Sequence, residues 1–369
     1  MNWDTEADMI IRDLAINERI PTIRELEYFL AYKGGQSVWR FIATKYGREK
    51  IGEIFQSMKR YGNAQKGFED AIGMDFEELT EQWHKYIKKE YYPDVEGRDE
   101  VKDIAKRLTD HKKSGNFYNV SPTISPDGSH IAVLSDRSGY MDIYLLDAVS
   151  GRKVKRLIKG NRSIDFEELK FLQPGISWSP DSEKIVIAAK AGSSDALYLI
   201  NIKTGKQEKI PFQLDGVFTA SWSPNGDKLA FVGNEGGASD IYLYDLVSKK
   251  LDNLTDDVFS DSEPSWNSDG TQIVFVSDRD KIIDKNKMSS NGMFYHNYKQ
   301  KNIYTLNLET KKINQITDTQ YNENYPIFAN TKDVIFYTAD YQGTWNLFRH
   351  DLLTGESVVI TNLLTGLFQ

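Results

Sequence analysis

A four-residue turn, Ser-Pro-Asp-Gly or a close variant, recurs along this sequence, each time just ahead of a short apolar run. The four copies occupy residues 125–128, 179–182, 223–226 and 267–270. Self-similarity of this kind is typical of a repeat fold. A single unit of about 40 residues cannot bury both of its faces alone, so the units must pack on one another. The turns therefore predict one body built from stacked units.

Each unit is predicted to contain four strands, because its apolar residues alternate with a period of two. The first strand ends at a tryptophan or its counterpart: Ile124, Trp178, Trp222, Trp266 and Phe328. Second strands are expected over 131–135, 185–189, 229–233, 273–277 and 334–338, and third strands over 142–147, 196–201, 240–245, 302–307 and 346–351. Residues 250–254 and 312–316 are examples of the fourth. Four strands repeated five times predict a β-propeller, with the tryptophans packed between neighbouring blades.

The amino-terminal part, residues 1–95, is predicted to be a separate helical domain. Asp4 and Asp75 are candidate amino-terminal caps, Gly34-Gly35 is expected to break a helix, and Pro93 is expected to end the last one. The fold class is therefore multidomain, with helices first and an all-β region after them.

Residues 96–116 are predicted to be a linker that contains an outer propeller strand over 103–110. The sequence Arg-Leu-Thr-Asp at 107–110 matches the ends of the third and fourth units at 253–256 and 315–318. With five units over 117–369, we expect an incomplete propeller of five blades out of six, in which three strands of a sixth blade are absent from this chain.

The turns and the Asp-Ile-Tyr strands, as at 142–144 and 240–242, resemble those of the six-bladed TolB-type β-propellers with WD-like repeats. The resemblance covers about 117–362 and implies that fold. It also implies a bacterial protein that is periplasmic or secreted, although no signal peptide is present in this sequence. The fifth unit departs from the pattern because 329–332 read Ala-Asn-Thr-Lys in place of the turn.

The helical part resembles the carboxyl-terminal tail of a gluzincin-type, peptidase MA-like domain. This likeness is carried by residues 3–9 and by 34–41 running on to 46–47. In that family a His-Glu-x-x-His motif and a later glutamate hold zinc, and none of these is present here. The resemblance implies a fragment of a longer exported protein whose catalytic segment is missing from this chain.

Few residues in the sequence point to catalysis. There is no cysteine, and none of the five histidines stands at metal-ligand spacing. We therefore predict no catalytic residue, no metal and no cofactor. Glu6 and Asp8 are expected in surface or capping roles, and the turn aspartates 127, 181 and 269 as turn formers in preference to calcium ligands. The net charge of −8 without a basic patch argues against nucleic acid, and no apolar run is long enough to span a membrane.

Two insertions, at 161–174 and 279–301, are predicted to rise on one rim of the propeller. Aromatic residues and methionine are enriched where proteins bind partners. The second insertion supplies the candidate binding residues, which are Met293, Phe294, Tyr295, His296 and Tyr298. The alternative is that these residues form a local plug on the propeller.

Three functions remain open from the sequence. The preferred one is a non-enzymatic scaffold of the bacterial envelope that binds a protein or peptide on the insertion face. The second is a fragment of an exported zinc metallopeptidase-like protein that lacks its catalytic segment. The third is a binder of a small molecule or glycan in the central channel.

Overall fold

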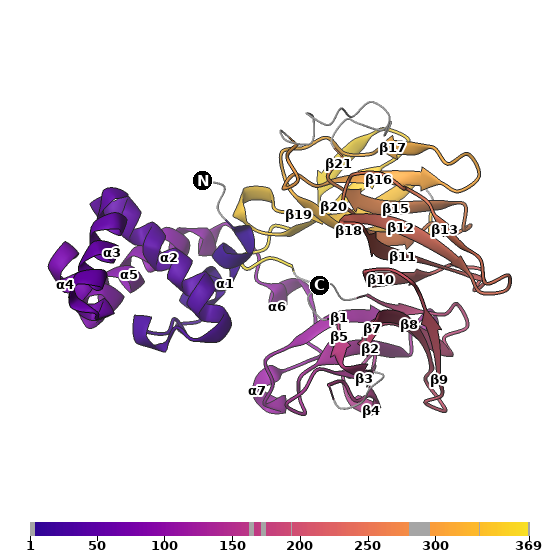
Figure 1. Ribbon diagram of the computed structural model, residues 1–369, viewed down its shortest axis with the longest axis horizontal. Coiled ribbons are helices and arrows are strands. Elements are labelled where there is room, and N and C mark those ends of the chain that lie inside the picture. Colours follow the sequence, from indigo (N-terminus) through magenta and orange to yellow (C-terminus); the bar gives the residue numbers. More distant parts are fainter. Residues whose placement is uncertain are drawn as a thin grey trace. The chain divides into compact units, whose positions relative to one another are not determined.

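The computed structural model describes residues 4–161, 166–170, 175–192, 194–279, 296–331 and 333–367 and contains two compact units (Figure 1). The helical unit comprises Met1–Ala105, Asp340–Asn346 and Thr361–Phe368. The propeller unit comprises Lys106–Ala339 and Leu347–Ile360. None of the helices that the structure describes is both long and apolar enough to cross a membrane.

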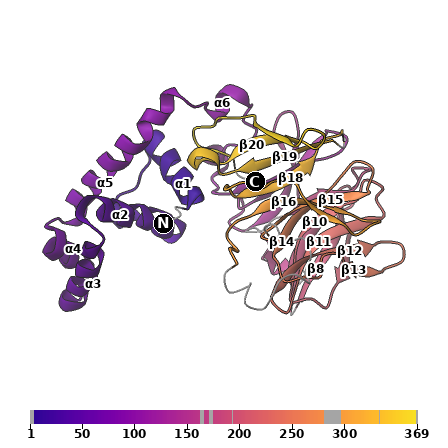
Figure 2. The ribbon, with the colours of Figure 1, turned by 90° about the horizontal axis from the view of Figure 1, so that it is seen from above.

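The helical unit begins with a series of helices, of which α3 and α4 form a hairpin (Figure 2). Its elements are α1 (Thr5–Ile16), η1 (Ile23–Glu25), α2 (Tyr28–Tyr46), α3 (Glu49–Tyr61), α4 (Ala64–Ile72), α5 (Phe76–Tyr91), η2 (Tyr92–Glu96) and α6 (Val101–Ile104). The predicted caps are confirmed, because the carboxylate of Asp4 accepts a hydrogen bond from the backbone N–H of Ala7 and that of Asp75 accepts bonds from Glu77 and Glu78.

The predicted helix break at Gly34-Gly35 is wrong, because α2 runs through both glycines. Glycine inside a helix costs only about 1 kcal/mol, which packing can offset. The packing here is visible at Gly34, where a Cβ would lie 2.4 Å from Cδ2 of Leu26. Gly34 therefore allows the chain before α2 to lie close against the helix.

Asp8 is a buried charge and not the surface or capping residue that the sequence suggested. Its carboxylate accepts hydrogen bonds from Tyr91 Oη at 2.7 Å and from Arg12 Nη2 and Arg40 Nη1, both at 3.2 Å. Burial raises the pKa of Tyr91, and the neighbouring carboxylate of Asp8 raises it further. The network joins α1, α2 and α5 across the core of the unit.

The helical unit also contains two segments from late in the sequence. Arg12 Nη1 donates to the carbonyl of Gly343 at 3.2 Å, and Arg98 Nη1 donates to Thr344 Oγ1 at 2.8 Å. The backbone N–H of Asp99 donates to the carbonyl of Asn362 at 2.8 Å. The unit is therefore assembled from both ends of the chain.

The propeller unit consists of five sheets that follow one another in chain order (Figure 1). Blade 1 contains β1 (Asn119–Ile124), β2 (His130–Ser135), β3 (Asp142–Asp147) and β4 (Lys153–Ile158). Blade 2 contains β5 (Glu168–Leu169), β6 (Ile176–Trp178), β7 (Lys184–Ala191), β8 (Ser194–Asn201) and β9 (Gln207–Pro211). Blade 3 contains β10 (Gly216–Trp222), β11 (Lys228–Glu235), β12 (Ala238–Asp245) and β13 (Leu251–Asn253).

The last two blades have the same antiparallel order. Blade 4 contains β14 (Asp261–Trp266), β15 (Gln272–Ser277), β16 (Asn302–Asn307) and β17 (Ile313–Gln315). Blade 5 contains β18 (Glu323–Phe328), β19 (Val334–Ala339), β20 (Asn346–Asp351) and β21 (Glu356–Val359), with η5 (Tyr341–Gly343) between β19 and β20. The predicted fold class, helices followed by five propeller blades, is confirmed.

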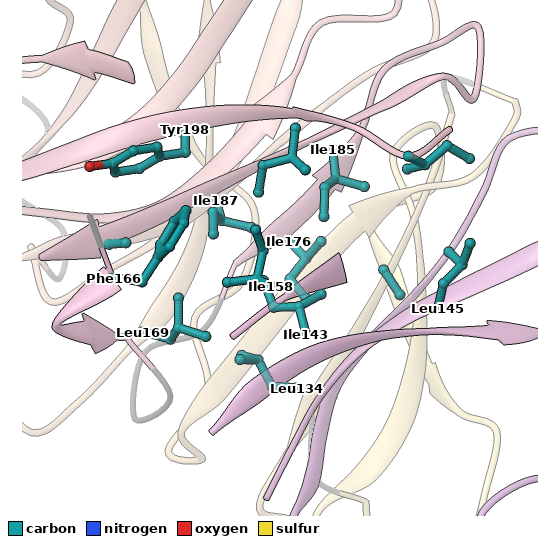
Figure 3. Packing of buried hydrophobic residues seen from close by; sticks show 14 of the residues in the cluster. Leu134, Ile143, Leu145, Ile158, Phe166, Leu169, Ile176, Ile185, Ile187 and Tyr198 are labelled. Atoms are coloured by element: carbon teal, nitrogen blue, oxygen red, sulfur yellow. The ribbon is translucent and has the colours of Figure 1, made fainter. Parts of the chain in front are cut away.

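Successive blades pack through alternate residues of their strands. We call the face that packs on the preceding blade the leading face, and the opposite one the trailing face. Between blades 1 and 2, Leu134 and Ile143 of the trailing face meet Ile185, Ile187 and Tyr198 of the leading face (Figure 3). The other three interfaces repeat this arrangement. No comparable contact joins β18 to β1 among the strands that the structure describes, so the succession is open between blades 5 and 1.

The tryptophans lie between the blades, as predicted. Trp178, Trp222 and Trp266 are 6%, 8% and 9% exposed. Nε1 of Trp178 donates to the carbonyl of Thr123 in blade 1, and Nε1 of Trp266 donates to that of Ser221 in blade 3. Each of these two indoles therefore binds the backbone of the preceding blade.

The outer strand expected over 103–110 is not formed. The chain passes from α6 through an extended segment into α7 (His111–Ser114) and then enters β1. The prediction was based on the similarity of 107–110 to 253–256 and 315–318. Those two segments follow on from outer strands that pair with the third strand of their own blade, whereas residues 107–110 have no such strand beside them in the part of the chain that the structure describes. Residues 106–118 instead lie on the leading face of blade 1, where a preceding blade is lacking.

Candidate functional site

The predicted binding residues are only partly within the described structure. Met293, Phe294 and Tyr295 lie outside the described residues. The side chain of His296 is 7% exposed, with Nε2 3.5 Å from Asp278 Oδ2 and its ring 5.4 Å from that of Phe259. Tyr298 is 67% exposed. The structure therefore does not present His296 on an open surface together with Tyr298, and a binding role for the insertion stays a prediction.

Arg279, at the start of the second insertion, is fully buried. Its guanidinium lies 2.9 Å from Asp257 and 2.5 Å from Asp261 and 5.3 Å from the ring centre of Phe275. Burial raises the pKa of Asp261 to about 6, while the positive charge of Arg279 opposes that rise. The same burial raises the pKa of Asp257.

A similar arginine is present in blade 1, which has no such insertion. Arg137 Nε donates to Ser135 Oγ at 3.3 Å, and its Nη2 donates to Asn119 Oδ1 at 3.2 Å. In blade 4, Arg279 makes the corresponding bonds to Ser277 and Asp261. Because this arrangement recurs at the same place in two blades, we interpret it as a device that holds the blade together.

Asp240, Asp257 and Asp261 bring carboxylate oxygens within 4.8 Å of one another. Two of them are paired with Arg279, and Asp240 accepts hydrogen bonds from Asn253 Nδ2 and Thr255 Oγ1. These partners satisfy the carboxylates from within the protein. The turn aspartates are engaged likewise, since Asp127 accepts bonds from its own turn that lower its pKa to about 2.

The inner strands of four blades are bulged at one equivalent position. Ser121, Thr219, Glu263 and Tyr325 have positive φ and coincide with shifts of strand register, which is typical of bulges. Glu263 is half-buried, and burial raises its pKa to about 7. Its Oε2 accepts a hydrogen bond from the N–H of Tyr325, so Glu263 links blades 4 and 5.

The binding of a small molecule or glycan in the central channel, the third function considered from the sequence, stays a prediction.

The leading face of blade 1 is the interface position that no blade fills. Val133, Tyr144 and Leu146 form a cluster there, in the places that Ile187, Tyr198 and Ile200 take in blade 2. The three residues are nevertheless 2%, 4% and 1% exposed, because residues 106–118 cross over them. Ile124, at the tryptophan position, is 60% exposed.

The crossing segment is attached at both ends. Nζ of Lys106 donates to the carbonyl of Val149 at 2.9 Å, beside the β3–β4 turn. Nδ2 of Asn116 donates to Ser135 Oγ at 3.2 Å, and the N–H of Phe117 donates to the carboxylate of Asp136. The segment therefore runs from the turn after β3 to the end of β2.

Between the segment and blade 1 a cavity of about 480 Å³ remains. Pro122, Ile131, Val133 and Leu146 contribute the apolar side, and Lys106, Arg107, Leu108 and Thr109 contribute the other. A second cavity of about 480 Å³ lies along the same segment and is lined by Arg107, Lys113 and Arg137 among others. We call the first cavity and its rim the blade 1 groove.

The groove is lined by positive charges although the chain as a whole is acidic. Residues 106–113 contain Lys106, Arg107, Lys112 and Lys113 against one carboxylate, Asp110, whereas the whole chain has a net charge of −8. The carboxylate of Asp110 is engaged by the backbone N–H groups of Lys112 and Lys113. Phe117, at the end of the groove, is 85% exposed.

Sequence reasoning missed this groove, although two signals were present. Ile124 replaces the tryptophan of later blades, which marks a face with a different neighbour. The basic run at 106–113 stands out within an acidic chain. Only the packing of 106–118 against blade 1 brings the two together.

Comparisons with known proteins support the fold. Residues 169–293 match the family model described as TolB beta propeller domain. No curated protein matches the sequence.

Two of the similar solved structures are TolB proteins. TolB from Acinetobacter baumannii aligns with a TM-score of 0.52 at 20% identity over 66% of this chain and 54% of that one. A putative TolB from Agrobacterium tumefaciens aligns with a TM-score of 0.52 at 19% identity over 66% of this chain and 80% of that one. The chain thus spans about half the length of the Acinetobacter protein. At these identities the likeness shows the fold alone, which is a TolB-like β-propeller.

Proposed function

We propose that this protein is a non-catalytic scaffold of the bacterial envelope that binds another protein through the blade 1 groove. The observation that carries the proposal is the leading face of blade 1, which is covered by residues 106–118 instead of a blade. A cavity of about 480 Å³ is within the size range of ligand sites.

The residues around the groove favour recognition over chemistry. Its lining combines aliphatic side chains with lysine and arginine, and it contains one histidine, His111, and no carboxylate. Arginine and aromatic residues are enriched at protein interfaces. Phe117 and Tyr118, which are 85% and 38% exposed, extend the apolar surface beyond the cavity.

The envelope location rests on the resemblance to TolB-type propellers and on the lack of cysteine in the sequence, which is compatible with an oxidising compartment. The gluzincin-like character of the helices belongs to the same proposal of an exported parent protein. A zinc-dependent protease assay on this chain tests the non-catalytic part of the proposal, and metal-dependent cleavage of a protein substrate would contradict it.

Selection from a random peptide library tests the binding function. The wild-type chain is expected to enrich peptides that the variant Ile131→Trp does not retain, because the indole occupies the cavity. Thr109→Trp fills the groove from the opposite side and serves as an independent variant. Peptides that bind all three proteins equally, or no enrichment at all, would contradict a binding role for the groove.

A further inference from the structure

We propose that the blade 1 groove recognises a short acidic peptide in which aliphatic side chains alternate with carboxylates. This inference rests on the proposed binding function and names the chemistry of the partner. It combines two observations, the apolar lining of the groove on blade 1 and the positive charge along its rim.

The aliphatic part follows from what the other leading faces contact. The leading face of blade 2 packs on Ala132, Leu134, Ile143 and Leu145 of blade 1. The leading face of blade 4 packs on Ala230, Val232 and Ile241 of blade 3. In each case the partner is a pair of neighbouring strands that present aliphatic side chains at alternate positions. The leading face of blade 1 has the same alternation, but residues 106–118 cover Val133, Tyr144 and Leu146. Aliphatic side chains of a bound peptide therefore reach this face through the groove, where Pro122 and Ile131 are more open.

The acidic part follows from charge complementarity. Arg107 borders both cavities, and its side chain is 61% exposed although it lies 3.8 Å from Asp110. Lys106 also borders the groove, with Nζ bonded to the carbonyl of Val149, and Lys113 borders the second cavity, so three cations face one carboxylate here. In an extended peptide, residues between the aliphatic ones point away from the blade, toward the segment and solvent. Carboxylates at those positions meet the lysine and arginine side chains of the rim.

The size of the cavity limits the contact to a few residues. About 480 Å³ accommodates two or three side chains of the size of valine or leucine, so the contact resembles a short linear motif more than a domain interface. Complementary charge on such a rim raises the association rate and makes binding dependent on salt.

Fluorescence anisotropy with defined probe peptides tests the inference on the full chain. The first probe is Gly-Glu-Leu-Glu-Val-Glu-Leu-Glu-Gly with an amino-terminal dye. In the second, the leucines and valine are replaced by serine, and in the third the glutamates are replaced by lysine. We expect saturable binding of the first probe, binding about ten-fold weaker or less for the other two, and weaker binding at higher salt.

Matched variants locate the site. Arg107→Glu is expected to weaken binding of the acidic probe about three- to ten-fold, and Ile131→Trp or Thr109→Trp to abolish it. Lys206→Glu carries the same charge change in an exposed turn of blade 2 and is expected to bind as the wild type does. Equal loss in Arg107→Glu and Lys206→Glu would show a general charge effect and overturn the inference.

The outcomes separate this inference from the proposed function. If the library yields basic or neutral peptides that Ile131→Trp excludes, the groove binds proteins but the partner chemistry stated here is wrong. If no peptide depends on the groove, both fail. If sedimentation shows a dimer of the wild type that Ile131→Trp dissociates, a second copy occupies the groove, and the peptide inference is overturned.

Discussion

Ile124 in blade 1 and Trp178 in blade 2 occupy the same position of consecutive repeats, yet their surroundings differ completely. The indole of Trp178 is 6% exposed and bonds to the preceding blade, whereas Ile124 is 60% exposed. Both blades are antiparallel and follow the chain order, although the inner strand of blade 2 is divided into β5 and β6. In an open propeller the first repeat has no preceding blade to cover its leading face, and here residues 106–118 cover that face instead.

The strongest test of this comparison is truncation at the two equivalent positions. Trp178→Ala is expected to lower the free energy of unfolding by about 3–5 kcal/mol, because it leaves a cavity between two blades. Ile124→Ala is expected to change it by less than about 0.5 kcal/mol, as for other exposed positions. Urea denaturation followed by circular dichroism measures both. Similar losses for the two variants would mean that Ile124 is packed as the tryptophans are.

The equivalent arginines of blades 1 and 4 differ in burial, since Arg279 is fully buried and Arg137 is only half-buried. Arg279→Met is expected to cost about 3 kcal/mol or more, because it leaves Asp257 and Asp261 buried without their cation. Arg137→Met removes hydrogen bonds to neutral partners only, so about 1 kcal/mol is expected. Chemical denaturation of both variants at neutral pH gives the values, and an equal cost would argue against the charge pairing as the cause.

Blades 1 and 4 should also differ in how pH affects their contribution to the free energy of unfolding. The pKa of Asp261 is raised to about 6 in the folded protein from an ordinary value of 3.8. Its contribution to stability is therefore present below about pH 4 and is lost as the pH rises through 6. The stability of wild type relative to Asp261→Asn should fall by about 1–3 kcal/mol between pH 4 and pH 7.

Asp127 provides the control for that experiment. Hydrogen bonds from Ser125 and Ser129 lower its pKa to about 2, so its stabilisation is present above about pH 4 and is lost toward pH 2. The difference between wild type and Asp127→Asn should therefore be flat from pH 4 to pH 7. A flat difference for Asp261→Asn as well would contradict the raised pKa.

The smallest expected effect concerns the segment that covers blade 1. Asn116→Ala removes buried hydrogen bonds to Tyr118 and Ser135, a loss of about 1 kcal/mol. If local opening limits cleavage, trypsin should cut after Lys112 and Lys113 about five-fold faster. Lys206→Ala, in an exposed turn of blade 2, is the control and should leave that rate within about two-fold of the wild type. Unchanged cleavage in Asn116→Ala would show that this side chain does not hold the segment in place.

The sequence predicted the blades well because each strand carries its own signal. The Asp-Ile-Tyr strands and the Pro-Asp-Gly turns depend on local backbone geometry, and they form where expected. Residues 107–110 were misjudged because the motif Arg-Leu-Thr-Asp becomes an outer strand only when a third strand lies beside it. The groove was out of reach for the same reason, since it arises from packing between 106–118 and a face more than ten residues away.

Gly34-Gly35 and Asp8 illustrate the remaining errors. Glycine pairs often interrupt helices, but in α2 the close packing of Leu26 on Gly34 offsets the free-energy cost of the two glycines. Asp8 stands in a sequence pattern suited to solvent, and only the fold brings Arg12, Arg40 and Tyr91 to it. Such charge networks join residues up to 83 positions apart, which no local pattern encodes.

The helical unit includes residues from the far end of the chain, and this affects how the protein is made. Arg12 donates a hydrogen bond to the carbonyl of Gly343, 331 positions later. Met9 is 1% exposed and packs so closely on Gly366 that a Cβ at that glycine would lie 2.4 Å from the Met9 side chain. Because amino-terminal domains generally fold first during synthesis, the helices leave the ribosome long before these partners exist. Met9 and Arg12 therefore remain without these contacts until the residues around Gly343 and Gly366 have been translated.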